Sequence, residues 1–481
     1  MREIIKRATH IAITDYFPVR CPALESIFSY RKNFNNYTVG IDFNKKENEL
    51  RIFGGVSIGL IKYAIGKDTP YREEFEFDKP NKISTRLQVT PRDQLQRDMI
   101  QFLINAGNWE SNYNHTQISC NTETDSGKTF AAIAMISFMR VKTIIIVNRR
   151  NIKSIWLREI RKFTDMDEKR MLVLTHEIMN NIIDDKFDTD QYHIFIVVHR
   201  SLNQFANDRG WEKVGELFKK IGIGLKIFDE AHREFTNTTH IECNTNTQKT
   251  LYLTATLKLS DPSANRIFQN LFRDIPKFDQ MKLGYTEHKK HINMIAYFYD
   301  SNPTNEHIKS CKFTSGFSAV QHSMYQITED PYFFSILRDL VDKFTISKYY
   351  RTLILVSRIV ACEEIKDHLQ GSFPELSIGV YNSEINDKEK ERVFENDHLI
   401  ISTNRSLGEA VTIKNLQVVI NCEAHVNYGD QASGRLRKFD KDATYIYCEL
   451  IDKGFPSIRN QWKTRKRNYA EKFGKIIEIQ T

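Results

Sequence analysis

The chain has 481 residues, enough for about three domains, because single cores rarely grow beyond about 250–300 residues. Hydrophobic residues make up 41% and charged residues 27%, a balance that excludes wholesale disorder. Basic residues exceed acidic ones by 69 − 61 = 8, which permits an anionic partner without requiring one. No apolar run approaches the ~20 residues that cross a bilayer, and charges interrupt the first residues, so we expect a soluble protein without membrane contact.

The seven cysteines are widely spaced and form no Cys-x-x-Cys pair. Several of them lie within apolar runs, where a thiol acts as a small hydrophobic side chain. We therefore expect reduced cysteines in the core, no structural zinc site and an intracellular location.

The first block of the chain, residues 1–85, predicts a small α+β domain. Its expected strands are 10–14, 37–43 and 49–53, and its expected helices are 22–30 and 57–65. The charged stretch that ends this block reads as a connector, and we interpret the block as an accessory domain that binds nucleic acid.

Two later blocks alternate short β-rich runs with helix-length amphipathic segments. In residues 86–280 the expected strands are 116–120, 143–147, 171–174, 193–198, 225–228 and 250–253. In residues 331–455 they are 352–356, 377–381, 399–402, 418–421 and 444–448. This pattern favours two doubly wound α/β domains, each with a buried parallel sheet. Residues 281–330 are expected to be a linker or insertion, and residues 456–481 a basic C-terminal helix with interleaved aromatic residues.

A phosphate-binding loop is predicted where the first strand of residues 86–280 ends. Thr122-Glu-Thr-Asp-Ser-Gly-Lys-Thr129 opens the next helix, and a helix N-terminus attracts phosphate groups. Lys128 can reach the outer phosphates of a nucleotide, and the Thr129 hydroxyl can ligate magnesium. The expected contacts are Thr124, Asp125, Ser126, Gly127, Lys128 and Thr129. The alternative is a polar turn in which Ser126 caps the helix.

An acidic pair ends a later strand of the same block, in Phe228-Asp-Glu-Ala-His232. At a strand end Asp229 can hold magnesium, and Glu230 can orient or deprotonate an attacking water. Taken alone, the pair could equally be a solvated strand end. About 100 residues after a lysine loop, it indicates a site for a magnesium-bound nucleoside triphosphate.

This ordered set resembles the superfamily 2 nucleic-acid helicases that carry a DEAH-type motif, and the resemblance implies two tandem RecA-like domains. Thr254-Ala-Thr256 resembles the third helicase motif, which couples hydrolysis to strand movement in that family. Gln94, in Pro-Arg-Asp-Gln, stands where the family has a glutamine that reads adenine. Coupling roles are implied for His232, Thr254, Thr256 and Gln431.

Residues 431–437 (Gln-Ala-Ser-Gly-Arg-Leu-Arg) resemble the sixth helicase motif. The resemblance implies that Arg435 and Arg437 reach across a cleft to the γ-phosphate. The family spaces its two arginines three apart, and Lys438 stands at that position here, so Arg437 and Lys438 both remain candidates for the second contact. The implied catalytic residues are Lys128, Asp229, Glu230, Arg435 and Arg437.

Contacts to a nucleic-acid strand are expected from residues just past the strands of both blocks. Hydroxyl, backbone and basic groups there can bind phosphates regardless of sequence. Ser402-Thr403 and residues 409–416 also resemble the fifth helicase motif. The expected contacts are Arg149, Arg150, His199, Arg200, Ser201, Ser357, Arg358 and Thr403. Each could instead be an ordinary solvated loop residue.

Within the superfamily the chain is most similar to the UvsW-type phage helicases and next to the poxvirus transcript-release helicase. This resemblance implies an ATP- and magnesium-dependent helicase or translocase acting on single-stranded, duplex or branched DNA. It also implies a viral or phage origin, in a host cytoplasm, with replication, recombination or transcription proteins as partners. Two alternatives stay open: a motor acting on RNA or transcripts, and a nucleic-acid-binding module that ATP switches with little turnover.

Overall fold

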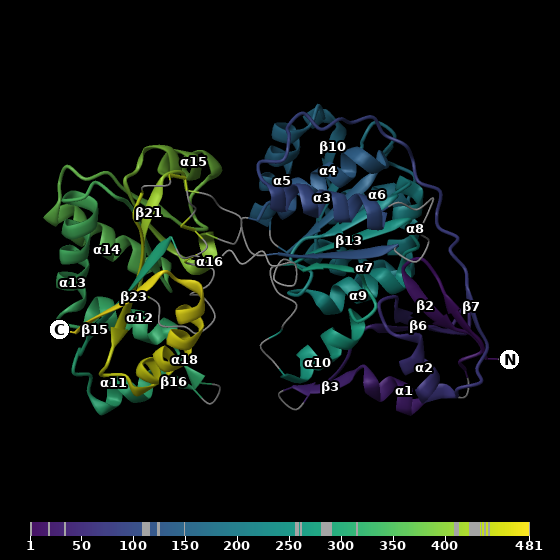
Figure 1. The fold of residues 1–481 in the computed structure, drawn as a ribbon, viewed down its shortest axis with the longest axis horizontal. Helices are drawn as coiled ribbons and strands as arrows, with labels where there is room; N and C mark the ends of the chain where they lie inside the picture. Colours follow the sequence, from purple (N-terminus) through teal and green to yellow (C-terminus); the bar gives the residue numbers. More distant parts are fainter. Residues whose placement is uncertain are drawn as a thin grey trace. The chain divides into compact units, whose positions relative to one another are not determined.

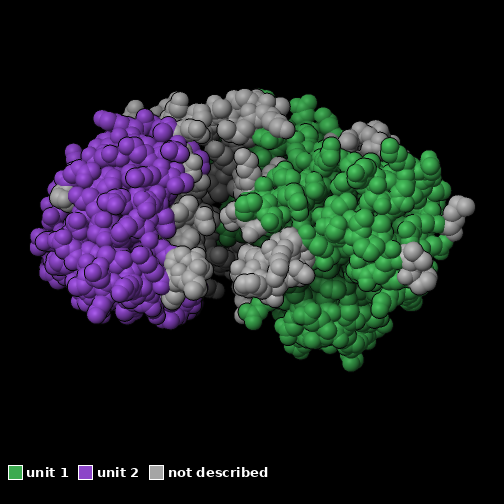
Figure 2. All heavy atoms as spheres, turned by 90° about the horizontal axis from the view of Figure 1, so that it is seen from below, with its two compact units in different colours: residues 1–285 green, residues 286–481 purple. Residues whose placement is uncertain are grey.

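A computed structural model describes most of the chain, which divides into two compact units, Met1–Tyr285 and Thr286–Thr481 (Figure 2). The residues described are 2–17, 20–32, 35–107, 116–122, 126–148, 150–254, 259, 262–279, 291–313, 316–407, 413–422, 433, 435–436, 439–440 and 443–480. Side chains are described for most of these residues.

The first unit begins with a five-stranded sheet of mixed direction (Figure 1). Its strands, in spatial order, are β5 (Ile41–Asn44), β6 (Glu49–Phe53), β2 (His10–Ile13), β1 (Ile4–Lys6) and β7 (Tyr71–Glu73). Helices α1 (Pro22–Ile27) and α2 (Ile58–Ile65) and a hairpin of β3 (Ser29–Lys32) and β4 (Asn35–Thr38) accompany it. The single strand expected at 37–43 is split, because Gly40 turns the chain with φ +82° where a side chain would collide with Leu271.

A seven-stranded parallel sheet forms the rest of the first unit. Its order is β10 (Met171–Val173), β11 (Ile194–Val198), β9 (Thr143–Val147), β12 (Leu225–Phe228), β13 (Lys249–Thr254), β8 (Gln117–Asn121) and β14 (Lys277–Asp279). One face packs on α3 (Gln94–Gly107), α4 (Lys128–Met139) and α5 (Arg150–Phe163). The other packs on α6 (His176–Ile183), α7 (His199–Arg209), α8 (Trp211–Ile221), α9 (Phe235–Asn244) and α10 (Pro262–Leu271). Both faces are therefore covered, as continuous apolar strands require.

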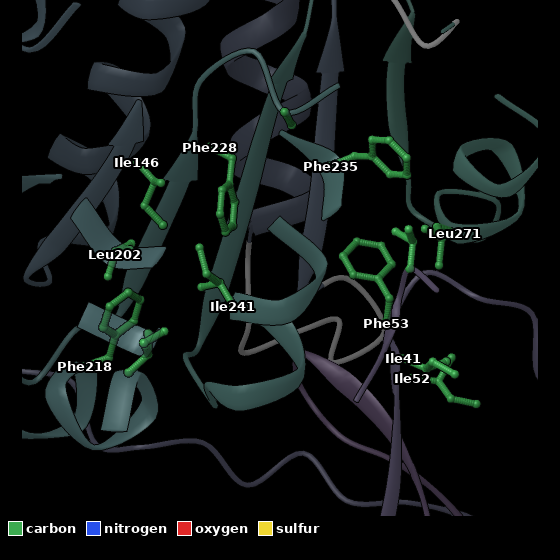
Figure 3. Close-up of a cluster of buried hydrophobic side chains, with 14 of the residues drawn as sticks. Ile41, Ile52, Phe53, Ile146, Leu202, Phe218, Phe228, Phe235, Ile241 and Leu271 are labelled. Carbon is green, nitrogen blue, oxygen red and sulfur yellow. The ribbon is translucent and has the colours of Figure 1, made fainter. Parts of the chain in front are cut away.

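The small sheet and the large sheet of the first unit share one hydrophobic core (Figure 3). Phe53 of β6 packs against Tyr252 and Phe272, with ring centroids 5.8 and 5.1 Å apart. A polar contact adds to this, because the buried Gln117 side chain donates to the Thr9 carbonyl at 3.1 Å. The N-terminal block is thus built into the first unit.

The second unit contains another seven-stranded parallel sheet. Its order is β19 (Ile378–Tyr381), β20 (Leu399–Thr403), β18 (Arg351–Val356), β21 (Leu416–Asn421), β22 (Tyr445–Asp452), β15 (Ile292–Tyr299) and β23 (Lys475–Gln480). The helices are α11 (Asn305–Ser310), α12 (Ala319–Thr328), α13 (Phe333–Val341), α14 (Ile359–Ser372), α15 (Asp387–Asn396), α16 (Asn404–Leu407) and α18 (Pro456–Lys472). A short hairpin joins β16 (Lys312–Phe313) to β17 (Gly316–Phe317).

The predicted fold class is confirmed: two tandem RecA-like parallel α/β domains follow a small α+β domain. The second sheet, however, extends into two segments where the sequence analysis placed no strand. β15 lies in the segment expected to be a linker, and it pairs in parallel with β22 on one side and β23 on the other. Its eight residues are mostly apolar, because an interior strand is buried on both faces. β23 lies within residues 456–481, all of which were expected to be helical; α18 ends at Lys472, and β23 forms the sheet edge.

Helix α18 packs its aromatic side chains into the core of the second unit. Ile458, Trp462, Tyr469 and Phe473 belong to a hydrophobic cluster with strands of the sheet, and all four are buried.

Among the described helices, none is both long and apolar enough to span a bilayer. The seven cysteines are free, and six of them are buried.

Candidate nucleotide and nucleic-acid sites

The loop that precedes α4 is held by hydrogen bonds to its own backbone and to a neighbouring strand. Lys128 Nζ donates to the backbone carbonyl of Thr122 at 2.6 Å. The Ser126 hydroxyl donates to the side-chain hydroxyl of Thr122, also at 2.6 Å. The Thr122 N–H donates to the carbonyl of Thr254, the last residue of β13, at 3.2 Å. Ser126 therefore does not cap the helix, since Gly127 occupies the N-cap position. Thr124 and Asp125 lie outside the described residues.

Gly127 is required by its conformation and by its surroundings. Its φ of +94° lies in the left-handed region, and a Cβ at this position would lie 2.1 Å from Gln96 Nε2. The loop can therefore make this turn only with glycine. Such a turn directs backbone N–H groups toward an anion at the start of the following helix.

Asp229 follows β12 at the same carboxyl edge of the sheet as the loop. Its Oδ2 accepts a hydrogen bond of 2.9 Å from Trp156 Nε1 on α5. Burial and the neighbouring Glu230 carboxylate raise the pKa of Asp229 to about 6, while the Trp156 hydrogen bond and the Lys128 charge act in the opposite direction. The Lys128 ammonium is therefore close enough to Asp229 for the two charges to interact.

Glu230, His232 and Thr254 form a connected group beside the loop. His232 Nδ1 lies 2.8 Å from Thr254 Oγ1 and 3.2 Å from Glu230 Oε2. Burial lowers the pKa of His232, so the ring is neutral near pH 7. Glu230 has φ +52°, a conformation that non-glycine residues adopt at an energetic cost and often at functional sites. Thr256 lies outside the described residues.

The glutamine beside the loop is Gln96, which the sequence analysis missed. Gln94 is exposed on α3 and donates to Asp98 of its own helix at 2.6 Å. Gln96 is buried, accepts from the Arg92 N–H at 2.9 Å and lies against Gly127. Helical spacing contained the signal, since Gln96 shares the buried face of α3 with Met99. The prediction that Gln94 reads adenine stays a prediction, and the exposure of its side chain does not support it.

The residues of this site fit a magnesium-bound nucleoside triphosphate. A glycine turn at a helix N-terminus, a lysine and a buried carboxylate are the groups such a ligand needs. Among the described residues no group of three or more His, Cys, Asp or Glu side chains could hold a metal ion by itself. Magnesium does not require such a group, because it usually takes one or two protein ligands together with phosphates and waters.

The expected strand-contacting residues of the first unit have different environments. Arg200 is exposed and Ser201 is half-buried in the first turn of α7. His199 is only 2% exposed, and its ring stacks on Phe228 with centroids 6.0 Å apart. Burial lowers the pKa of His199 to about 3, so the expectation that it contacts a strand does not fit its position in the core. Arg149 and the side chain of Arg150 lie outside the described residues.

In the second unit, three expected strand-contacting residues line one pocket of about 760 Å³. Ser357 follows β18, Arg358 occupies the N-cap position of α14, and Thr403 ends the adjacent strand β20. The other lining residues are Val320, Ile359, Val360, Glu363, Ser383, Glu384 and Ser406. The pocket thus lies at the carboxyl edge of neighbouring strands, where ligands of such sheets bind.

Arg435 also belongs to the second unit, where it is 8% exposed. The next residue, Leu436, is buried, and its carbonyl oxygen lies 3.2 Å from His291 Nε2. Gln431, Arg437 and Lys438 lie outside the described residues. The roles of all four in the sixth motif stay predictions.

Comparisons with known proteins agree with this architecture. Residues 89–259 match the family model described as "Type III restriction enzyme, res subunit". No curated protein matches the chain. Among solved structures, Saccharomyces cerevisiae Dbp5 bound to RNA and ADP BeF3 is 12% identical, with 81% of this chain and 94% of that chain covered and a TM-score of 0.50.

Two further solved structures are similar to the chain. The helicase domain of Pyrococcus furiosus Hef is 11% identical, with 77% of this chain and 99% of that chain covered and a TM-score of 0.47. T4 UvsW is 14% identical, with 99% of both chains covered and a TM-score of 0.36. We base the fold assignment on the Dbp5 likeness and on the two parallel sheets. The family match makes residues 89–259 similar to the res subunit of type III restriction enzymes, and the fold of the chain is similar to that of Dbp5.

Proposed function

We propose that the protein is an ATP-dependent DNA helicase or translocase that unwinds, anneals or remodels DNA, including branched DNA. The observation that carries this proposal is the contact series from the loop to the acidic pair: Thr122 to Thr254, Thr254 to His232 and His232 to Glu230. A change at the phosphate-binding loop can therefore reach the carboxylate that acts on water and the end of β13. The family description favours DNA, because restriction enzymes act on DNA.

The residues of the first unit divide the work of ATP hydrolysis among them. Lys128 binds the outer phosphates, Thr129 and Asp229 hold magnesium, and Glu230 orients the attacking water and accepts its proton. Magnesium, when bound, supplies neutralisation of the phosphate charge. The neutral His232 ring contacts both the Glu230 carboxylate and the Thr254 hydroxyl and so holds the two side chains next to each other. Arg435, to which the resemblance to the sixth helicase motif gives a role at the γ-phosphate, belongs to the second unit, and that role stays a prediction.

The strand is held by groups that recognise its backbone. Ser357, Arg358 and Thr403 line the pocket of the second unit, and Arg200 and Ser201 supply similar groups in the first. Hydroxyl and guanidinium groups bind phosphates without reading bases, so we expect little sequence preference and a strong salt dependence.

RNA is the second candidate substrate, because the fold matches a protein whose structure contains RNA. Backbone contacts of the kind described here do not distinguish the sugars by themselves. Matched DNA and RNA polymers therefore have to be compared directly.

The test is an ATP hydrolysis assay with single-stranded, duplex, forked and four-way DNA and with the RNA equivalents. We expect stimulation by DNA and a loss of at least about 100-fold in Glu230→Gln, as for other general bases. Lys128→Ala should lose turnover as well. Matched controls are Glu177→Gln and Lys169→Ala, which change exposed residues of the same unit.

Wild-type turnover in both Lys128→Ala and Glu230→Gln would refute the proposal. Stronger stimulation by RNA than by matched DNA would replace the DNA substrate with RNA. Nucleotide-dependent strand binding without multiple turnover would instead identify a switch that ATP controls.

A further inference from the structure

A tryptophan outside all the helicase-like segments binds the carboxylate that we assign to magnesium. Trp156, in the middle of α5, is 1% exposed. Its indole N–H donates to Asp229 Oδ2 at 2.9 Å. An indole has only this one donor, and a buried tryptophan usually directs it to a partner. Here the partner is a functional carboxylate.

Helix α5 has a second contact with the nucleotide site. Phe163, its last residue, packs edge-on against Phe130 with ring centroids 4.9 Å apart. Phe130 directly follows Thr129 in the first turn of α4. The helix is therefore attached both to the carboxylate after β12 and to the helix that carries Lys128.

The start of the same helix lies where strand contacts are expected. Arg150 is its first residue, and Trp156 follows six residues later. At ~1.5 Å per residue, about 9 Å of helix separate the two positions. Because a helix moves as a nearly rigid element, a displacement of its first turn moves the Trp156 ring as well.

We propose that Trp156 is a positioning residue that fixes the Asp229 carboxylate and links strand contact at the start of α5 to the magnesium site. This inference rests on the proposed function. A carboxylate with one oxygen held by a donor has a restricted orientation, and partners that orient a metal-binding carboxylate typically contribute 10–100-fold to metal affinity. When the first turn of α5 moves on strand binding, the donor that holds Asp229 moves with it.

The first test uses Trp156→Phe, which keeps an aromatic ring in the core and removes the donor together with the second ring of the indole. Binding of a fluorescent ATP analogue is measured during a magnesium titration, without nucleic acid. We expect the magnesium concentration for half-maximal binding to rise about 10–100-fold. Trp211→Phe is the matched control, because Trp211 stacks on His240 away from this site, and it should keep the wild-type value.

A second variant, Trp156→His, retains a ring N–H. Its magnesium requirement should lie between the wild-type and Trp156→Phe values, whereas a purely structural role predicts the greater loss for the smaller ring. Urea unfolding of each variant separates stability from magnesium binding. Intrinsic fluorescence should also change when magnesium and nucleotide bind, and Trp156→Phe should lose this change while Trp211→Phe retains it.

The failure of this inference is distinguishable from failure of the proposed function. A wild-type magnesium requirement in Trp156→Phe, with nucleic-acid-stimulated hydrolysis intact in the unmodified protein, would overturn the positioning role alone. Absent stimulation in the unmodified protein would refute the motor and the link to the strand. A stimulation ratio that stays at the wild-type value in Trp156→Phe would also refute that link.

Discussion

Burial lowers the pKa of two lysines on adjacent strands of the first sheet. Lys226 of β12 forms an ion pair of 2.5 Å with Glu242, and both side chains are fully buried. Lys249 begins β13 and is 1% exposed, and burial lowers its pKa to about 8.

Lys249→Met should flatten the pH dependence of the first unit's stability between about pH 8 and pH 10.5. The ordinary lysine pKa of 10.5 exceeds the folded value of about 8, a difference that corresponds to at most roughly 3 kcal/mol. The unfolded chain binds more protons between these values, so the contribution of this lysine to stability rises from pH 8 to pH 10.5 and is constant below pH 8. Urea unfolding across this range should give a flatter profile for the variant than for wild type.

Lys226→Met is the matched comparison. It leaves the Glu242 carboxylate buried without its cation, which should cost about 3–5 kcal/mol in the free energy of unfolding. An unchanged urea midpoint in Lys226→Met would show that the Lys226–Glu242 ion pair does not stabilise the first unit.

At this scale the sequence predicted chemistry better than side-chain direction. Lys128 and Asp229 could be placed together, because both follow strands of one parallel sheet and such ends share an edge. The exposure of Gln94 and the burial of His199 could not be predicted, since they depend on which face of a helix is buried. The Trp156 contact joins residues 73 positions apart, and no local pattern reports it.

Helix α18 shows that a basic, aromatic segment can be a structural element. Arg465 is buried and pairs with Glu449 at 3.1 Å. The Tyr469 hydroxyl also donates to Glu449, at 2.7 Å, and so does Tyr447, at 2.9 Å. One carboxylate of β22 thus fixes the helix against the sheet, while Arg467 on the same helix is exposed.

Arg465→Met should therefore destabilise the second unit by about 3–5 kcal/mol, because Glu449 would remain buried without its cation. Arg467→Met, which changes an exposed residue of the same helix, should change the unfolding free energy by less than about 0.5 kcal/mol. Chemical denaturation of the second unit measures both. Equal effects of the two substitutions would show that the ion pair does not fix the helix.

Element prediction succeeded where strands were short, apolar and bounded by helices, as at β9 and β12. It failed at β15 and β23, which flank each other in the sheet but stand far apart in the chain. β15 follows a long polar stretch, and β23 mixes polar and apolar residues without strict alternation. Only the pairing of the completed sheet identifies these two segments as strands.

On the scale of the whole molecule, the N-terminal block is part of the folding unit of the first parallel sheet. Thirteen of the buried residues in the shared hydrophobic cluster come from residues 1–85: Ile4, Ile11, Ile13, Tyr16, Leu24, Phe28, Val39, Ile41, Leu50, Ile52, Phe53, Val56 and Ile61. Figure 3 shows Ile41, Ile52 and Phe53 in one group with Leu271 of α10. The sequence separated this block by its change of pattern, which carries no information about what the block packs against.

Deleting residues 1–85 should therefore unfold the first unit. Without Phe53, the Tyr252 and Phe272 rings would each lose one buried aromatic contact. Fully burying a side chain of this size contributes about 1.5–3 kcal/mol. Losses of this size at several positions exceed the net stability of a domain, about 5–15 kcal/mol. The fragment Thr286–Thr481, which has two hydrophobic clusters of its own, should fold alone and is the control. Circular dichroism and urea unfolding compare the deletion variant with the control fragment. A deletion variant that unfolds cooperatively at the wild-type urea concentration and still binds nucleotide would show that the block is an independent domain. The shared core instead requires that the variant aggregates while the control fragment folds.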